Sequence, residues 1–310
     1  MLRKILLMFT PLAAFTVAAA LIVSNPATLS AQAPKGKGGK GGGKGKGGFG
    51  GPPAIRELKP NLYLVTGAGG NTTVRVTDAG VIVVDTKNLG EENYNALMDL
   101  IKSKTQQPVR YAIVTHVHQD HSGNTASFLA AGAQVIANEG EKAELRTYTS
   151  NAGTPAAPSI TYTNDYTVNL GGTTAQLHHY GPAHTGGDTI VYFPDLRVVA
   201  GGDAIPNGAP NCDFANGGSV TNWPKFVDQV LKLDFDLLVP GHGEPMTKAD
   251  VQAYKEKWEA FVSRALEQVK KGTPKEQLLD NIKVDDLGWN INSYRARLDP
   301  FYAELQAAAK

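Results

Sequence analysis

The distribution of apolar residues predicts a series of short strands. Runs at residues 62–65, 73–76 and 81–84 are rich in Val, Ile, Leu and Thr, and Gly and Asn turns separate them. Such runs are typical of strands that are buried on at least one face. Similar runs predict further strands at residues 109–115, 134–137, 160–163, 166–170, 174–179, 188–193, 197–200 and 236–239.

Helices are predicted between these strands. Residues 91–104 begin with acidic side chains and end with lysines, which suits the helix dipole. The remaining helical patterns cover residues 125–131, 139–147, 222–232 and 248–271, and a Pro-rich stretch at 154–158 interrupts the series. Strands and helices alternate in two halves, which indicates an α/β or α+β fold.

The first 33 residues have the features of a targeting segment. Arg3 and Lys4 precede an apolar stretch at residues 5–23, and Ala31-Gln32-Ala33 follows it. This order is typical of a secretory signal peptide. The apolar stretch also approaches the length that spans a bilayer, so a retained N-terminal membrane anchor is the alternative. Both readings predict an exported protein, either periplasmic or secreted.

Residues 34–53 contain little besides Gly and Lys, and we predict a flexible linker there. We favour a solvated spacer, and attachment to a membrane or cell wall through the lysines is the alternative. The chain has a formal net charge of +1, but no acidic residue precedes residue 52, so the remainder is acidic on balance. Such a domain offers no cationic surface for nucleic acid.

Four metal-ligand side chains lie within six residues of one another. His116, His118, Asp120 and His121 directly follow the apolar run 111–115, which is predicted to be a strand. Imidazole and carboxylate together suit zinc and related metals, and clustering of this kind has no ordinary role in packing. His184, after a Gly-Pro turn, Asp203, after two glycines, and His242, between glycines, are further candidate ligands.

Other polar residues have two readings. His178 and His179 are adjacent in a predicted strand and point to opposite faces, so we predict ordinary structural histidines. Asp85 follows the strand 81–84 and either caps a turn or orients a ligand. Thr185 and Asp188 are predicted to fix the loop after His184. Cys212, the single cysteine, cannot form an internal disulfide and is predicted to be a free thiol.

The order of these motifs resembles that of the metallo-β-lactamase-fold hydrolase superfamily. The resemblance rests on His-x-His-x-Asp-His, the isolated His184, Gly-Asp at 202–203 and Pro-Gly-His-Gly at 240–243, and it covers about residues 55–265. It implies an α+β fold of the αββα type, with two mixed sheets face to face, helices outside and metals at one edge. We therefore expect a catalytic domain at 54–271 and a packed C-terminal extension at 272–310.

The resemblance also implies roles for the candidate ligands. One metal would take His116, His118 and His184, the other Asp120, His121 and His242, and Asp203 would bridge them. The expected cofactor is two Zn²⁺ per chain, with iron or manganese as alternatives. Asp120 is the expected catalytic residue, because it would both ligate a metal and orient the attacking hydroxide.

The substrate is less constrained than the metal site. Lactamases of one class in this fold carry Cys at the position of Asp203 and usually Lys three residues later, where this chain has Pro206. Thioesterase, lactonase and phosphodiesterase members share the combination of His121 and Asp203. We therefore predict an exported dinuclear zinc hydrolase that cleaves an ester, thioester or amide-like bond in a small molecule by attack of metal-generated hydroxide.

Three alternatives remain. They are a β-lactamase, in which Lys225 would supply the missing cation, a single-iron sulfur dioxygenase, which we rank low, and a wall-tethered metal-binding protein without catalytic activity. Loops at 67–72, 148–160 and 205–220 are expected to contact the substrate.

Overall fold

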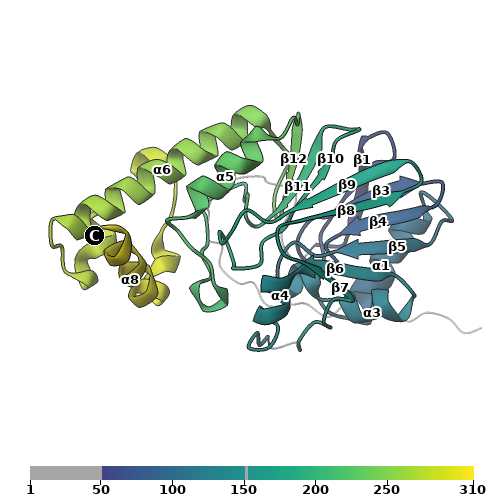
Figure 1. Cartoon of the computed structure of the whole chain (residues 1–310), viewed down its shortest axis with the longest axis horizontal. Coiled ribbons are helices and arrows are strands. Elements are labelled where there is room, and N and C mark those ends of the chain that lie inside the picture. The colour runs from purple at the N-terminus through teal and green to yellow at the C-terminus, as the bar shows by residue number, and fades with distance from the viewer. Residues whose placement is uncertain (1–50, 151–152) are drawn as a thin grey trace, which may run out of the picture. The chain divides into compact units, whose positions relative to one another are not determined.

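The computed structural model describes residues 51–150 and 153–310, which form two mixed sheets flanked by helices (Figure 1). The predicted signal or anchor segment and nearly all of the Gly/Lys-rich linker lie outside these residues. The described residues belong to one compact unit, and the division at residue 271 stays a prediction. None of the described helices is long and apolar enough to cross a membrane.

The first sheet has seven strands in sequence order. Its first four strands pair antiparallel and the rest pair parallel. The strands are β1 Ala54–Lys59, β2 Leu62–Thr66, β3 Thr72–Thr77, β4 Gly80–Val84, β5 Val109–Ile113, β6 Gln134–Asn138 and β7 Ile160–Tyr162.

The second sheet has six strands in the order β13-β12-β11-β10-β9-β8. Only β11 and β12 pair parallel in it. The strands are β8 Asp165–Leu170, β9 Thr173–His178, β10 Ile190–Phe193, β11 Val198–Gly202, β12 Leu237–Pro240 and β13 Met246–Thr247.

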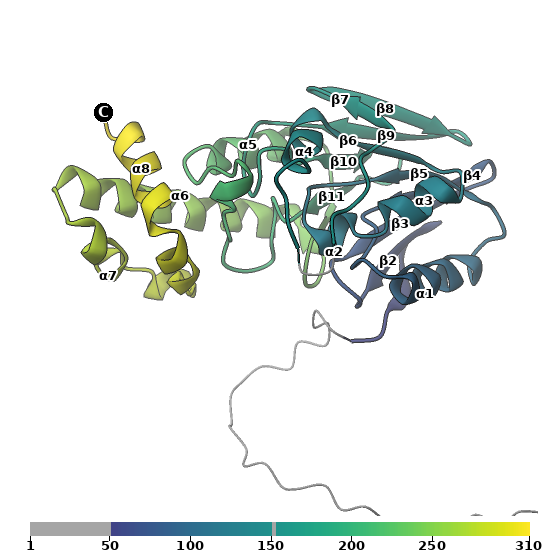
Figure 2. The same ribbon diagram turned by 90° about the horizontal axis from the view of Figure 1, so that it is seen from below.

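The helices lie outside the two sheets. They are α1 Glu91–Lys102, α2 Gln119–Ser122, α3 Thr125–Ala130, α4 Glu139–Glu144, α5 Trp223–Lys232, α6 Lys248–Lys270, α7 Leu278–Asn281 and α8 Leu298–Ala308. Of these, α7 and α8 pack on α6. Short 3-10 helices lie at Phe214–Asn216, Lys275–Gln277, Asp285–Leu287 and Asn292–Arg297. Figure 2 shows α1 and α3 beside the first sheet, with α5 and α6 on the side of the second.

Alternation along the strands produces the four layers. In β4, Ile82 and Val84 enter the core between the sheets, whereas Val81 and Val83 pack with residues of α1 and α3. Successive side chains of a strand point to opposite faces, so a strand covered on both sides is apolar throughout. The αββα sandwich that the sequence predicted is therefore confirmed, as is the α+β class.

The C-terminal residues pack on α6 through aromatic side chains. The rings of Phe261 and Phe301 are stacked at 5.9 Å, and Tyr294 lies 4.9 Å from Phe301. Phe301 is fully buried, and the capping box of Thr247 and Asp250 holds the start of α6. Residues 272–310 thus share the apolar core of α5 and α6.

Several element boundaries differ from the predicted ones. Strand β5 ends at Ile113 rather than 115, and β10 begins at Ile190 rather than 188. The reason is local: Thr115 and Thr189 are joined by a bond from the Thr189 amide to the Thr115 carbonyl, outside either sheet. Two edge strands, β1 and β13, were not predicted, because their exposed residues show no apolar run.

Candidate metal centre

The carboxyl ends of three strands, β5, β11 and β12, carry six of the seven candidate ligands, and His184 lies in the loop between β9 and β10. Residues 115 and 116 follow β5 by a short turn, and α2 begins at Gln119. Asp203 directly follows β11, and the Pro240-Gly241 turn at the end of β12 presents His242. Because β4 pairs parallel with β5, and β11 with β12, the carboxyl ends of each pair lie side by side, and the two ligand groups show that both pairs end at the same edge of the sandwich.

Four of the side chains form a first group. The group consists of His116, His118, His184 and Asp203. His118 Nδ1 lies 2.9 Å from His184 Nε2, which is 3.7 Å from Asp203 Oδ2. His116 Nε2 is buried and has no hydrogen-bond partner among the described residues.

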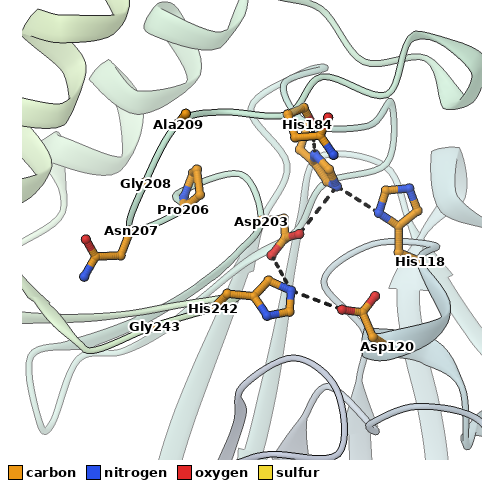
Figure 3. Close-up of a pocket in the computed structure, with 11 residues that line it drawn as sticks. His118, Asp120, His184, Asp203, Pro206, Asn207, Gly208, Ala209, His242 and Gly243 are labelled. Atoms are coloured by element: carbon orange, nitrogen blue, oxygen red, sulfur yellow. Dashed lines mark hydrogen bonds and ion pairs between the residues drawn. The ribbon is translucent and has the colours of Figure 1, made fainter. Parts of the chain in front are cut away.

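Asp120, His121 and His242 form a second group beside it. His242 Nε2 lies 3.1 Å from Asp120 Oδ2 and 3.2 Å from His121 Nε2. Asp203 Oδ1 is 3.5 Å from Nε2 of both histidines of this group. Asp203 therefore directs one carboxylate oxygen to each group, as Figure 3 shows for His184 and His242.

This arrangement fits divalent metal ions. Buried polar atoms normally have partners, yet Nε2 of His116 and Oδ1 of Asp203 are buried without a hydrogen bond. His116 belongs to the first group, and Oδ1 of Asp203 lies 3.5 Å from Nε2 of both histidines of the second group. A set of imidazole nitrogens and carboxylate oxygens is the donor chemistry that zinc takes.

Asp85 contacts His121 of the second group directly and His116 of the first group through Thr115. Its Oδ2 accepts from His121 Nδ1 at 2.7 Å and from the Thr115 hydroxyl at 2.9 Å, while Oδ1 accepts from the Thr115 amide. The Thr115 hydroxyl also lies 3.0 Å from His116 Nδ1. Of the two readings of Asp85, the structure therefore shows the one in which it orients a candidate ligand.

Two residues of the 205–222 segment hold the remaining imidazoles of the first group. His118 Nε2 lies 2.7 Å from Asp213 Oδ2, and His184 Nδ1 donates to the Asn211 carbonyl at 2.6 Å. These contacts leave His118 Nδ1 and His184 Nε2 facing the centre. Neither partner could be predicted from the sequence, because both lie in an irregular loop of Gly, Asn and Pro.

Burial and neighbouring charges set the protonation of these groups. Burial lowers the pKa of His184 to about 4 and that of His116 well below its usual value, which favours the neutral form that ligates metal. Burial also opposes charge on His121, but Asp120, Asp203 and Asp85 together raise its pKa. The charge of His121 lowers the pKa of Asp120 despite burial, which keeps that carboxyl ionised.

The sequence from residue 65 to residue 242 matches the family model of the metallo-beta-lactamase superfamily. The chain belongs to this superfamily. The matched segment contains every residue of the two ligand groups. The superfamily and the site together indicate a hydrolase with a metal-binding site.

Curated relatives of this superfamily member have several activities. It is 28% identical over 227 residues to the 2,4-dinitroanisole O-demethylase subunit alpha of Nocardioides sp. (strain JS1661), covering 72% of this chain and 67% of that protein. It is 27% identical over 209 residues to the metallo-beta-lactamase type 2 of Elizabethkingia meningoseptica, covering 64% and 82%.

Solved structures share the fold at lower identity. A metallo-beta-lactamase from Pontibacter korlensis superposes with a TM-score of 0.60 at 20% identity, covering 67% of this chain and 99% of that one. The sec-alkylsulfatase Pisa1 from Pseudomonas sp. gives 0.62 at 18% identity, covering 83% of this chain and 50% of its own.

Two glycines make room for the ligands of this superfamily member. A Cβ atom on Gly241 would lie 1.9 Å from Asp203 Oδ1, and one on Gly70 would lie 2.3 Å from His121 Cε1. Neither distance is compatible with a side chain. The backbone itself therefore forms part of the wall behind Asp203 and His121.

Lys87, which the sequence did not single out, lies under the same wall. Its Nζ is fully buried and donates to the carbonyls of Val65 and Gly70 at 2.7 and 2.6 Å. Burial lowers the pKa of Lys87 to about 7, although the negative charges of Asp85 and Asp120 act in the opposite direction and raise it. The buried ammonium thus joins the Gly70 turn to the strand end that carries Asp85.

The remaining predicted residues lie outside the two ligand groups. His178 pairs with Asp165 at 2.6 Å, and His179 contacts the Asp188 carbonyl. Asp188 accepts from the amide and hydroxyl of Thr185 and so fixes the loop after His184. Cys212 is buried, and burial raises the pKa of its thiol, so it is an unreactive packed residue.

A cleft of about 490 Å³ opens over the centre. Five candidate ligands line it together with residues 206–209, Asn211 and Gly243 (Figure 3). The predicted substrate loop 205–220 therefore forms one wall, whereas the loops at 67–72 and 148–160 are not among the lining residues. No Lys or Arg of the described residues lines this cleft.

Proposed function

We propose that the protein is a dinuclear zinc-dependent hydrolase that cleaves an ester, thioester or amide-like bond in a small molecule. One observation supports this most directly: two groups of ligand side chains share Asp203 between them, at the floor of an open cleft. His116, His118 and His184 would hold one metal, and Asp120, His121 and His242 would hold the other.

The side chains around the cleft have separable tasks. Divalent metals supply a water of lowered pKa and a Lewis acid for the substrate oxygen. Asp120 Oδ2 faces His242, and the side chain is 28% exposed, so the carboxylate can accept a hydrogen bond from a water in the cleft and orient it. The segment 206–209 limits the side of the cleft opposite Asp120 and would position the substrate.

The cleft favours a substrate without a carboxylate beside the scissile bond. Pro206 lies in its wall, and Lys225 is not among the lining residues. A β-lactam offers a carboxylate, and a charged hydrogen bond to it is worth about 1.5–3 kcal/mol. The missing cation would therefore weaken β-lactam binding roughly 10–150-fold.

β-Lactam hydrolysis is the second candidate. The relative from Elizabethkingia meningoseptica is named a metallo-beta-lactamase, and another from Chryseobacterium indologenes is 28% identical over 203 residues. The name of the O-demethylase subunit adds cleavage of an aryl methyl ether to the chemistries worth testing. A wall-tethered metal-binding protein without catalytic activity is the remaining alternative. The open cleft over the ligands makes it less favoured, because a protein that only binds metal does not need to leave the metal accessible to a substrate.

We also propose that the protein is exported, with the N-terminal segment as signal peptide or anchor and the Gly/Lys-rich linker as a solvated spacer, attachment of that linker to a membrane or cell wall being the alternative. Only the sequence supports this. Small molecules are the proposed partners, and no nucleic acid is among them. Cell fractionation with an epitope on Lys310 tests the location, and recovery in the cytosol refutes it.

Metal analysis and a substrate panel test the activity. We expect about two zinc ions per chain and higher kcat/KM on an ester or thioester than on a cephalosporin. Asp120→Asn should lower kcat about 10²–10⁴-fold, the usual loss for a positioned acid or base. One tightly bound iron would favour the dioxygenase reading, and a cephalosporin kcat/KM above about 10⁴ M⁻¹s⁻¹ would favour the lactamase.

A further inference from the structure

The C-terminal segment 272–310 contacts the loop that partners the metal ligands. Glu304, on α8, accepts four hydrogen bonds from residues 219–221. Its Oε1 accepts from the hydroxyls of Ser219 and Thr221, both at 2.6 Å, and from the Thr221 amide. Its Oε2 accepts from the Val220 amide at 3.1 Å. A half-buried carboxylate with this many donors fixes the backbone of the segment firmly.

Two further contacts of the C-terminal segment reach the same loop. Arg297 donates to the side-chain oxygen of Asn211, and the Tyr294 hydroxyl donates to the Pro210 carbonyl at 3.4 Å. Phe214, next to Asp213, packs against the rings of Tyr294 and Phe301. The segment therefore contacts the loop at both ends, with both polar and aromatic side chains.

The loop passes these contacts on to His184. The Ser219 amide donates to the Ala183 carbonyl, and Asn222 Nδ2 donates to the Pro182 carbonyl at 2.8 Å. Asn211 accepts from His184 Nδ1, and the Asp213 amide donates to the His184 carbonyl. Glu304 thus reaches the backbone of Ala183, which precedes His184, through Ser219, and Arg297 reaches the His184 ring through Asn211.

His118 depends on the same loop. Among the described residues, Asp213 is the hydrogen-bond partner of the His118 side chain outside the ligand groups, and the backbone carbonyl of Asp213 in turn accepts from the amides of Gly218 and Asn216. The second ligand group is held differently. Asp85 fixes His121, and among the described residues the side chains of Asp120 and His121 form no hydrogen bond or ion pair with residues 205–222.

We propose that Glu304 and Arg297 are positioning residues for the metal group of His118 and His184. The C-terminal segment would act through the 205–222 loop to set the direction of these two imidazoles. This inference rests on the proposed function, since it presumes that the centre holds metal. Changes in the C-terminal segment should alter metal affinity at the group of His118 and His184 and leave the group of Asp120, His121 and His242 unchanged.

Metal affinity in the full chain tests this inference. Glu304→Ala and Arg297→Ala should each weaken one bound Zn²⁺ equivalent about 10-fold in a chelator competition, the lower end of the effect of outer partners on metal affinity. The other equivalent should keep its affinity. Glu304→Gln retains an oxygen for the Oε1 bonds and should fall between Ala and wild type. Gln306→Ala, exposed on the same helix, is the matched control.

Two readouts separate positioning from general stability. Replacement of zinc by Co²⁺ should give a changed visible absorption spectrum in Glu304→Ala, because the ligand field at one metal changes. Hydrogen exchange at the amides of Val220, Thr221 and Asp213 should accelerate in the same variant. A merely structural role would lower the melting temperature and leave the Co²⁺ spectrum as in wild type.

The possible failures can be told apart. A wild-type chain that binds fewer than two ions refutes the dinuclear proposal. Wild-type affinities and Co²⁺ spectra in both Glu304→Ala and Arg297→Ala refute the inference about the C-terminal segment. If Glu304→Ala does not fold, Arg297→Ala decides alone, since it removes a single hydrogen bond at a partly exposed position.

Discussion

Replacing Asp85 by Asn should damage the metal centre without removing a metal ligand. An amide has the size of the carboxylate but only one acceptor oxygen. If that oxygen replaces Oδ2, the amide NH₂ faces the amide N–H of Thr115. If it replaces Oδ1, the NH₂ faces His121 Nδ1 and requires the ring to carry its proton on Nε2. That tautomer has no lone pair on Nε2, the nitrogen that faces the other ligands of its group.

The size of the effect follows from the bonds that are lost. A hydrogen bond to a charged group is worth about 1.5–3 kcal/mol. Loss of one such bond at His121 would change the equilibrium constant for metal binding roughly 10–150-fold, at 1.4 kcal/mol per tenfold. Outer partners of metal-bound histidines typically change metal affinity by about 10–100-fold, which is the same range. We therefore expect Asp85→Asn to weaken one zinc equivalent by about 10–100-fold.

Chelator competition with zinc on the purified chain measures this change directly. Glu141→Gln is the matched control, because Glu141 is a buried acid whose pKa is raised by burial and which makes no hydrogen bond to a candidate ligand. The control should retain wild-type affinity. Wild-type zinc affinity in Asp85→Asn would show that the carboxylate only caps the strand end, and the argument from the His121 tautomer would be wrong.

Two further substitutions address other parts of the centre, and a third addresses the stability of the fold. Gly241→Ala must displace Asp203 Oδ1 and should lower zinc affinity at least about 10-fold, whereas Gly208→Ala, which meets no atom within 4 Å, should not. Asp203→Ala should weaken both zinc equivalents in the same titration, and unchanged affinities would exclude a bridging role. Burial raises the pKa of Glu144 to about 8, so the folded state retains a proton that the unfolded state loses above about pH 4.5. The free energy of unfolding should therefore decrease as the pH rises from about 4.5 to about 8. Glu144→Gln should make this decrease smaller, as measured by denaturant titrations at pH 5 and pH 8.

The candidate ligands could be predicted because most of them lie close together in the sequence or directly after an apolar strand. His116, His118, Asp120 and His121 lie within six residues, and covalent proximity alone keeps them together. The apolar strands before Asp203 and His242 place those side chains at a strand end. The sandwich followed in the same way from buried strands such as β4, which is apolar at every position after Gly80.

The partners of the ligands could not be predicted, because tertiary structure alone brings them into place. Asp213 is separated from His118 by 95 positions, and the loop that carries it has no periodicity. Glu304 is one of several acids in the C-terminal helices, and nothing in its neighbours marks it as the acceptor for residues 219–221. Lys87 follows a strand like an ordinary turn residue, yet it is fully buried.

Each ligand group takes residues from both halves of the chain. His116 and His118 follow the first sheet, whereas His184 comes from the second half, and Asp120 and His121 face His242 in the same way. A metal in either group is consequently a cross-link between the two sheets at their open edge. Free metal at about 1,000 times its Kd adds about 4.1 kcal/mol to the stability of the native state. Metal supply would then govern survival of the chain during heating or proteolysis, and it would do so before any substrate is present.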